Sequence, residues 1–255
     1  MTEPMRIHRA LARAGIASRR KAETLVREGR VSVNGVLATI GQVVDPTKDQ
    51  ILVDGQPIQL ALSNAAWIVL HKPAGVMTTR SDPQGRRTVF DLVRDRPGLT
   101  YVGRLDLLTE GVLLFTTDGE AANALTHPSS EVERVYEATV RGDARTAARE
   151  APRGVSLGDG MAMPKWARAR ALPDGRWIFE LGLGEGRKRE VRRICSALGL
   201  EVDRLVRTRF GPIALGELAV GQSRNVTPAE SDAIHELVAQ HSARKHPAES
   251  GYDDA

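Results

Sequence analysis

Apolar residues between positions 67 and 208 come in short runs that end at glycines or polar turns. Strands outnumber long helices, so we predict an α+β domain on a mixed, mainly antiparallel sheet rather than a doubly wound fold. The expected strands are 67–71, 100–105, 112–117, 134–140, 176–183 and 202–208, and the expected helices are 119–127, 187–199 and 229–240. No run approaches the roughly 20 apolar residues of a membrane helix, and no secretory signal precedes the first domain, so we expect a cytoplasmic protein.

The first sixty residues have a different pattern. Two short helices are expected at 8–14 and 19–28, the second with Ser18 as its N-cap. Asn34-Gly35 and Asp54-Gly55 then match the two-residue turns of β-hairpins. We therefore predict four regions: a small helical and hairpin domain at 1–60, a linker at 61–66, a larger domain at 67–240, and a disordered tail at 241–255.

Basic side chains are concentrated in two segments. Residues 6–30 hold eight of them against only two glutamates, and residues 187–209 hold eight against three acidic residues. Arginine predominates in both, and its planar guanidinium matches phosphate geometry, so the pattern favours a polyanion such as RNA over two solvated helix faces. The candidate RNA-binding residues are Arg6, Arg9, Arg13, Arg19, Arg20, Lys21 and Arg30, followed by Arg187, Lys188, Arg189 and Arg193.

The segment YVGRLDLLTEGVLLFTTDGE, residues 101–120, reads as strand, tight loop, strand and helix start. The loop exposes Asp106 and Glu110 between two buried strands, a placement that suits a working carboxylate. Two other interpretations stay open: Asp106 could merely turn the chain, or the two carboxylates could form a glycosidase pair. The low aromatic content, 4%, argues against a sugar-stacking groove.

Several long motifs together resemble one enzyme family. GRLD and TEG at 103–111, HKPAGVMTT at 71–79, RVYEATV at 134–140, EGRKREVRRI at 185–194 and RLVRTRFGP at 204–212 follow the order of the RsuA/RluB branch of ribosomal RNA pseudouridine synthases. The preceding sequence RIHRALARAGIASRRKAETLVREGRVSVNG resembles the S4 RNA-binding domain. The resemblance covers nearly the whole chain.

This resemblance implies a cofactor-free isomerase that converts uridine to pseudouridine in ribosomal RNA, with large-subunit RNA favoured as substrate. Asp106 would be catalytic, as nucleophile or as base, and Arg192 would be its basic partner. The resemblance implies that Tyr136 stacks on the uracil, that Arg104 helps to extrude the nucleotide, and that Leu205 and Lys72 contact the substrate. Core packing remains an alternative for Tyr136 and Leu205, as does a salt bridge for Arg104.

Glu190 departs from the family, whose members often carry glutamine there, so the polar contact made by that glutamine is in doubt. The spacing of GLGEGRKR, 182–189, fits neither common nucleotide-binding loop. Cys195 is the only cysteine and the six histidines show no ligand spacing, so we expect no metal site. We expect a monomer, and the alternative function is a non-catalytic S4-type ribosome assembly factor.

Overall fold

The computed structural model describes residues 4–45, 47–58 and 65–245. The chain divides into two compact units, and each is described here by itself. The first comprises Met1–Ala66 together with Asp95–Thr100 and Phe115–Gly119. The second comprises Trp67–Arg94, Tyr101–Leu114 and Glu120–Ala255. Most of the predicted linker, 61–66, lies outside the described residues.

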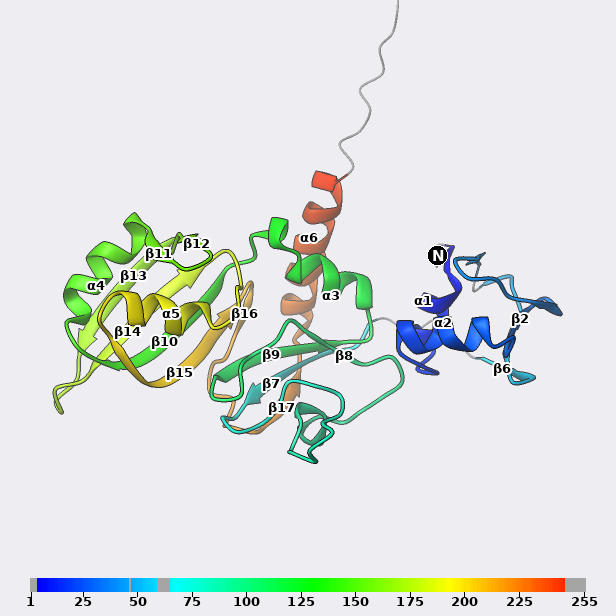
Figure 1. Ribbon diagram of the computed structural model, residues 1–255, viewed down its shortest axis with the longest axis horizontal. Helices are drawn as coiled ribbons and strands as arrows, with labels where there is room; N and C mark the ends of the chain where they lie inside the picture. Colours follow the sequence, from blue (N-terminus) through cyan, green and yellow to red (C-terminus); the bar gives the residue numbers. More distant parts are fainter. Residues whose placement is uncertain (1–3, 46, 59–64, 246–255) are drawn as a thin grey trace, which may run out of the picture. The chain divides into compact units, whose positions relative to one another are not determined.

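The first unit packs two helices against small sheets (Figure 1). Helix α1 spans Ile7–Arg13 and α2 spans Arg19–Arg27, where the Ser18 side chain accepts a hydrogen bond from the Lys21 backbone N–H, as predicted. Their apolar faces, including Leu11 and Leu25, bury against the strands. These strands are β1 (Met5–Arg6) paired with β4 (Val43–Val44), and a sheet of order β3-β2-β5-β6 made of Val36–Leu37, Val31–Val33, Ile51–Val53 and Gln56–Pro57.

The two predicted hairpins of the first unit are confirmed. Asn34 and Gly35 have φ of 52° and 81°, and they join β2 to β3. Asp54 and Gly55 repeat these values at 50° and 76°, joining β5 to β6. Positive φ at both central residues gives the turn the twist that two adjacent strands require, so these dipeptides set the register of the sheet.

A 9-stranded sheet dominates the described part of the second unit. Its order is β13-β14-β10-β15-β9-β7-β17, with β16 paired to β15 and β8 to β9. The strands are β7 (Trp67–Lys72), β8 (Thr100–Val102), β9 (Glu110–Thr116), β10 (Arg134–Arg141), β13 (Trp166–Ala171), β14 (Trp177–Leu183), β15 (Glu201–Phe210), β16 (Ile213–Ala214) and β17 (Ser223–Asn225). Buried side chains such as Leu113, Phe179 and Leu181 form its core.

Strand β15 joins the two halves of this sheet. It pairs antiparallel with β10 and parallel with β9, where Arg207 lies opposite Gly111. The prediction of a mixed, mainly antiparallel sheet is therefore confirmed. A Cβ atom at Gly111 would overlap the Arg207 carbonyl oxygen, so a residue without a side chain allows the two strands to approach.

The helices of the second unit are α3 (Gly119–Thr126), α4 (Ala144–Glu150), α5 (Glu190–Ala197) and α6 (Pro228–Lys245). Helix α4 packs on β13 and β14, whereas α5 packs on β15 and on the hairpin of β11 (Val155–Leu157) and β12 (Gly160–Ala162) (Figure 1). Short 3₁₀ turns lie at Val89–Leu92, Pro128–Ser130 and Ala151–Arg153. Among the described residues, no helix combines the length and hydropathy needed to cross a bilayer.

Three predicted boundaries were wrong by three residues or more. The strand expected at 100–105 ends at Val102, and the helix expected at 187–199 begins only at Glu190, because Arg189 has a left-handed φ of 51° that helical geometry excludes. Helix α6 continues to Lys245, so the first residues of the predicted tail, 241–255, are helical. The remainder of that prediction lies outside the described residues.

Candidate active site

Asp106 lies on a loop that the rest of the fold holds firmly. The loop follows β8, and the Thr109 backbone N–H donates to the Asp106 carbonyl oxygen over 3.0 Å, closing a tight turn. The buried Thr78 hydroxyl donates to the Leu105 carbonyl over 2.8 Å, and the Gly75 N–H donates to the Leu107 carbonyl over 2.8 Å. The segment 71–79 thus fixes the loop, while the Asp106 side chain itself stays partly exposed.

Lys72 lies beneath this loop with none of its surface exposed. Its ammonium donates to the carbonyl oxygens of Pro73, Leu107 and Thr109 at 2.9, 3.2 and 2.9 Å. Burial lowers the pKa of Lys72 to about 8, and the charges of Glu110 and Asp106 oppose that shift. Lys72 does not line the pocket described below, so the structure assigns it to holding the loop, where we had expected a substrate contact.

Arg192 extends from α5 toward the same loop. Its Nη2 atom donates to the Leu108 carbonyl oxygen over 3.0 Å. Burial and the neighbouring Arg189 lower the pKa of Arg192, whereas the negative charge of Asp106 raises it. The guanidinium is therefore close enough to Asp106 for the two charges to interact.

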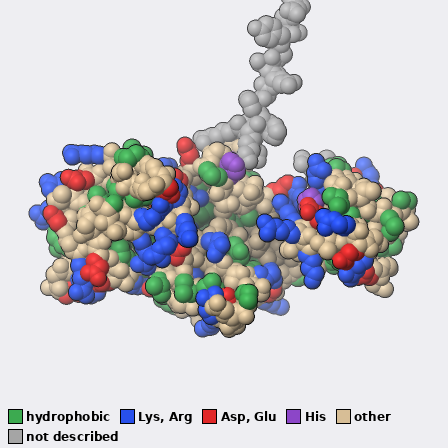
Figure 2. All heavy atoms as spheres, viewed as in Figure 1, with side chains coloured by type: hydrophobic (Ala, Val, Ile, Leu, Met, Phe, Trp, Pro, Cys, Tyr) green, Lys and Arg blue, Asp and Glu red, His purple; other side chains and the backbone are tan. Residues whose placement is uncertain are grey.

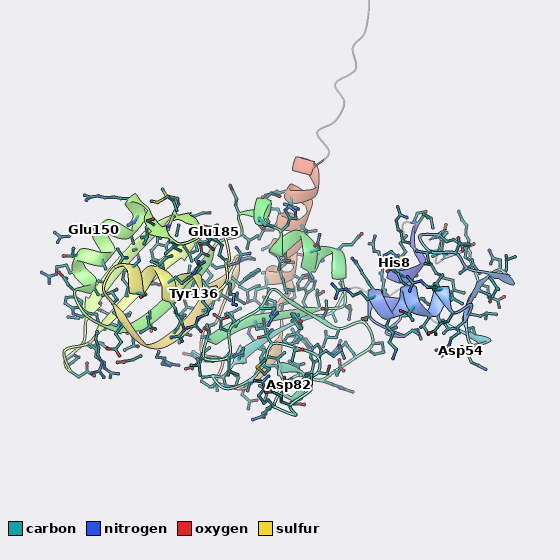
Figure 3. All side chains as sticks on the ribbon, in the orientation of Figure 1. His8, Asp54, Asp82, Tyr136, Glu150 and Glu185 are labelled. Atoms are coloured by element: carbon teal, nitrogen blue, oxygen red, sulfur yellow. The ribbon has the colours of Figure 1, made fainter. Side chains whose placement is uncertain are left out.

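A pocket of about 770 Å³ joins these groups to the sheet. Tyr136 on β10 is 9% exposed and Leu205 on β15 is 3% exposed, and both line it together with Arg104, Asp106 and Arg192. Figure 3 shows Tyr136 on its strand below the loop that carries Glu185. The structure therefore brings together five of the six residues expected to be catalytic or to contact substrate.

Two buried arginines in this pocket were not expected. Arg134 and Arg207 are 7% and 2% exposed, and their guanidinium carbons lie 5.3 and 5.1 Å from the ring centre of Phe210. Arg134 donates to the Val132 carbonyl over 3.0 Å, and burial lowers its pKa. A signal was present in the sequence, because Arg134 precedes Tyr136 by two residues and therefore points to the same face of the strand.

Glu190, which replaces the usual glutamine, holds the loop before α5. It is 4% exposed and accepts hydrogen bonds from the Arg187 backbone N–H at 3.0 Å and from Arg187 Nε at 3.1 Å. Burial raises the pKa of Glu190. A carboxylate with two acceptor oxygens can receive both donors, so this departure from the family pattern has a defined local role.

In the second basic segment, some side chains are held in ion pairs and others are exposed. Arg187 contacts Glu185 at 2.7 Å and Asp159 at 3.2 Å, and Arg193 contacts Asp159 at 2.7 Å. Lys188 and Arg189 are exposed and line the pocket. Figure 2 shows Lys and Arg side chains gathered over α5 and the loop before it.

In the first unit, exposed basic side chains lie on and around the two short helices. Arg19, Arg20 and Lys21 are exposed at the start of α2, and Arg6 donates to the Gly41 carbonyl over 3.0 Å. Arg30 is paired with Asp54 at 2.7 Å, so its charge is partly neutralised. The remaining candidates, Arg9 and Arg13, are partly exposed on α1.

Glu110 does not form a second catalytic carboxylate. It receives two hydrogen bonds from Arg204, at 3.0 and 2.7 Å, and this contact lowers its pKa. It is also absent from the pocket lining. The glycosidase alternative therefore loses its proposed partner for Asp106.

The remaining potential ligands offer little to a metal or to redox chemistry. Among the described residues, no group of three or more His, Cys, Asp or Glu side chains is arranged to hold a metal ion. Cys195 is buried, and burial raises the pKa of its thiol to about 12. Such a thiol is a poor nucleophile at neutral pH.

Comparisons with known proteins agree with this geometry. Residues 66–197 match the model of the RNA pseudouridylate synthase family, and residues 5–51 match the S4 domain. The chain is 45% identical over 243 residues to ribosomal large subunit pseudouridine synthase B of Pseudomonas aeruginosa, covering 91% of this chain and 62% of that protein. It is 42% identical over 241 residues to the Escherichia coli K12 protein of the same name, covering 91% and 83%.

Two further matches cover nearly the whole length of the matched proteins. An uncharacterized RNA pseudouridine synthase of Aquifex aeolicus is 41% identical over 239 residues, covering 92% of this chain and 95% of that protein. A solved pseudouridylate synthase structure superposes with a TM-score of 0.61 at 25% identity, covering 90% of this chain and 99% of that one. The chain therefore belongs to the RNA pseudouridine synthase family and carries an S4 domain ahead of its synthase domain.

Proposed function

We propose that this enzyme converts one uridine of large-subunit ribosomal RNA to pseudouridine, with Asp106 as the catalytic residue. The pocket that gathers Asp106, Arg192, Tyr136 and Leu205 carries the proposal. The names of the relatives from Pseudomonas aeruginosa and Escherichia coli support the choice of RNA. Such an enzyme would meet its substrate in the bacterial cytoplasm, and nothing in the pocket requires a second copy of the chain.

The reaction needs no external group. The bond between N1 of uracil and C1′ of ribose breaks, the base turns over, and C5 bonds to C1′ while the C5 proton moves to N1. Asp106 acts at the ribose, either by attacking C1′ or by taking the 2′ proton. Arg192 places a positive charge beside this carboxylate.

The remaining pocket residues hold the nucleotide. A base within folded RNA must leave its stack to be attacked, and an aromatic face can then receive it. Tyr136 offers that face on strand β10, and Leu205 and the exposed Arg104 line the same pocket. We propose that residues 1–60 grip the surrounding RNA through the basic side chains of α1 and α2.

The substitution Asp106→Asn tests the proposal. Pseudouridine would be mapped in ribosomal RNA from a deletion strain complemented with wild type, with Asp106→Asn, or with Asp232→Asn. Asp232 is an exposed residue of α6 and provides the same chemical change away from the pocket. One modification should be absent with Asp106→Asn alone, while the purified variant still binds RNA. A normal modification pattern in the deletion strain, or full activity of Asp106→Asn, contradicts the proposal.

The same variant separates catalysis from a role in ribosome assembly alone. A non-catalytic RNA-binding factor would work equally well with Asn at position 106. Restored ribosome assembly without pseudouridine would favour that second function.

A further inference from the structure

The two residues that follow Asp106 are large, apolar and exposed. Leu107 is 38% exposed and Leu108 is 58% exposed. Single exposed leucines are common on proteins, but two in succession after Asp106 place apolar surface next to the pocket that Asp106 lines. We call Leu107 and Leu108 the apolar tip.

The loop holds the apolar tip in place. The Leu107 carbonyl receives hydrogen bonds from the Gly75 N–H at 2.8 Å and from the Lys72 ammonium at 3.2 Å. The Leu108 carbonyl receives one from Arg192 at 3.0 Å. Because these carbonyls point into the protein, the backbone cannot rotate to bury the two side chains without breaking three hydrogen bonds.

The apolar tip also lies outside the pocket itself. Asp106 and Thr109 line the pocket on either side of it, whereas Leu107 and Leu108 do not. A nucleotide inside the pocket would therefore leave the apolar tip facing the nucleotides next to it. Arg104 and Arg189 line the same pocket and are exposed, so cations accompany this apolar surface.

Apolar surface beside exposed cations fits a nucleic acid better than a protein. Phosphates pair with the arginines, and base faces pack on apolar groups. Leucine is among the side chains that proteins insert between base steps when they distort nucleic acids. Extruding a nucleotide exposes the faces of its neighbours to water, and this lost stacking opposes the reaction.

We propose that Leu107 and Leu108 pack on the nucleobase adjacent to the extruded uridine and replace the stacking that it loses. This proposal rests on the proposed function and adds a determinant of substrate structure to it. The apolar tip would favour RNA in which the nucleobase next to the target uridine has a large ring surface. It would act together with the catalytic carboxylate because one loop carries both.

The test uses an RNA fragment containing the uridine that the wild-type enzyme isomerises. Leu107→Ala and Leu108→Ala should each lower kcat/KM by about tenfold, the effect of leaving one leucine side chain unburied. Both variants should keep the wild-type Tm because the side chains are exposed. Val220→Ala and Met163→Ala remove exposed apolar groups elsewhere in the same unit and should leave kcat/KM unchanged.

Changing the RNA identifies the partner of the apolar tip. An abasic residue beside the target uridine, on one of its two sides, should lower kcat/KM for wild type and abolish the difference between wild type and the double variant. With 2-aminopurine at that position, binding of the Asp106→Asn enzyme should change the fluorescence, and adding the two leucine substitutions should remove that change.

Three results would overturn the inference. The first is that kcat/KM of the double variant Leu107→Ala/Leu108→Ala lies within twofold of wild type. The second is that the double variant loses as much kcat/KM, relative to wild type, on RNA with abasic residues on both sides of the uridine as on intact RNA. The third is that sedimentation experiments show altered self-association of the double variant that explains its loss. Failure of the proposed function is distinguishable, since wild-type enzyme would then isomerise no ribosomal RNA fragment.

Discussion

The close approach of β9 and β15 can be tested with Gly111→Ala. Gly111 has a φ of 108°, where a residue with a side chain is strained by about 1–3 kcal/mol. The added Cβ would overlap the Arg207 carbonyl oxygen and lie 2.6 Å from the Arg207 nitrogen, and these backbone atoms cannot rotate away. Relieving the overlap by moving a strand costs a further 1–3 kcal/mol or so. The total, about 2–6 kcal/mol, is a large part of the 5–15 kcal/mol that typically stabilises a domain.

Gly175→Ala is the matched control. Gly175 has a φ of 81°, but a Cβ there would meet no atom within 4 Å. It therefore carries the conformational strain without the overlap. Urea unfolding can be followed by tryptophan fluorescence, because the chain has three tryptophans, at 67, 166 and 177, all in the second unit. Gly111→Ala should lose about 1–3 kcal/mol more unfolding free energy than Gly175→Ala.

Activity should separate the two glycine variants further. Moving β9 away from β15 shifts the Asp106 loop relative to Leu205, so Gly111→Ala should lose turnover even where it remains folded, whereas Gly175→Ala should not. If the unfolding free energies of the two variants agree within about 0.5 kcal/mol, the resolution of such comparisons, the close approach does not fix this part of the sheet.

Two further variants probe the supports of the site. Lys72→Met removes the donor shared by three loop carbonyls, so it should lower turnover at least about tenfold with little change in RNA affinity. The control Lys165→Met removes an exposed lysine and should match wild type in single-turnover assays. Equal rates for the two variants would refute the supporting role of Lys72. Glu190→Gln tests a pH dependence. Burial raises the folded-state pKa of Glu190 above its ordinary 4.5, so the folded state binds more protons than the unfolded state. The contribution of Glu190 to stability is therefore full below pH 4.5 and is lost as the pH rises through the raised pKa. Urea unfolding between pH 4.5 and 8 should therefore show the stability of wild type falling relative to Glu190→Gln, and a difference that does not vary with pH would contradict the assignment.

Local signals in the sequence predicted much of this structure. The Asn34-Gly35 and Asp54-Gly55 turns and the Ser18 cap depend on backbone geometry within a few residues, and all three were predicted correctly. The expected strands of the second unit were also found, because short apolar runs bounded by turns have few other solutions. Asp106, Arg192 and Tyr136 were selected through the family resemblance, and the pocket brings them together.

The errors concern interactions between distant parts of the chain. Lys72 appeared to be a substrate contact because no local pattern reveals that three carbonyls surround its ammonium. The ion pairs of Arg187 and Arg193 were not foreseen because Asp159, which pairs with both, lies between β11 and β12, far away in the sequence. Helix α4 and strand β13 were missed because alanine and arginine dominate both segments, and alanine gives only a weak apolar signal, even in the alternating WARARA of β13.

The parallel pairing of β9 with β15 also has a consequence for biosynthesis. Strand β9 follows the Asp106 loop directly, but its partner β15 begins only at Glu201, so the chain between them must be made before the pair can form. In a nascent chain emerging from the ribosome, the basic helices α1 and α2 can form long before the pocket that would receive a uridine. Translation therefore delays the assembly of the pocket until the residues up to Phe210 have left the exit tunnel.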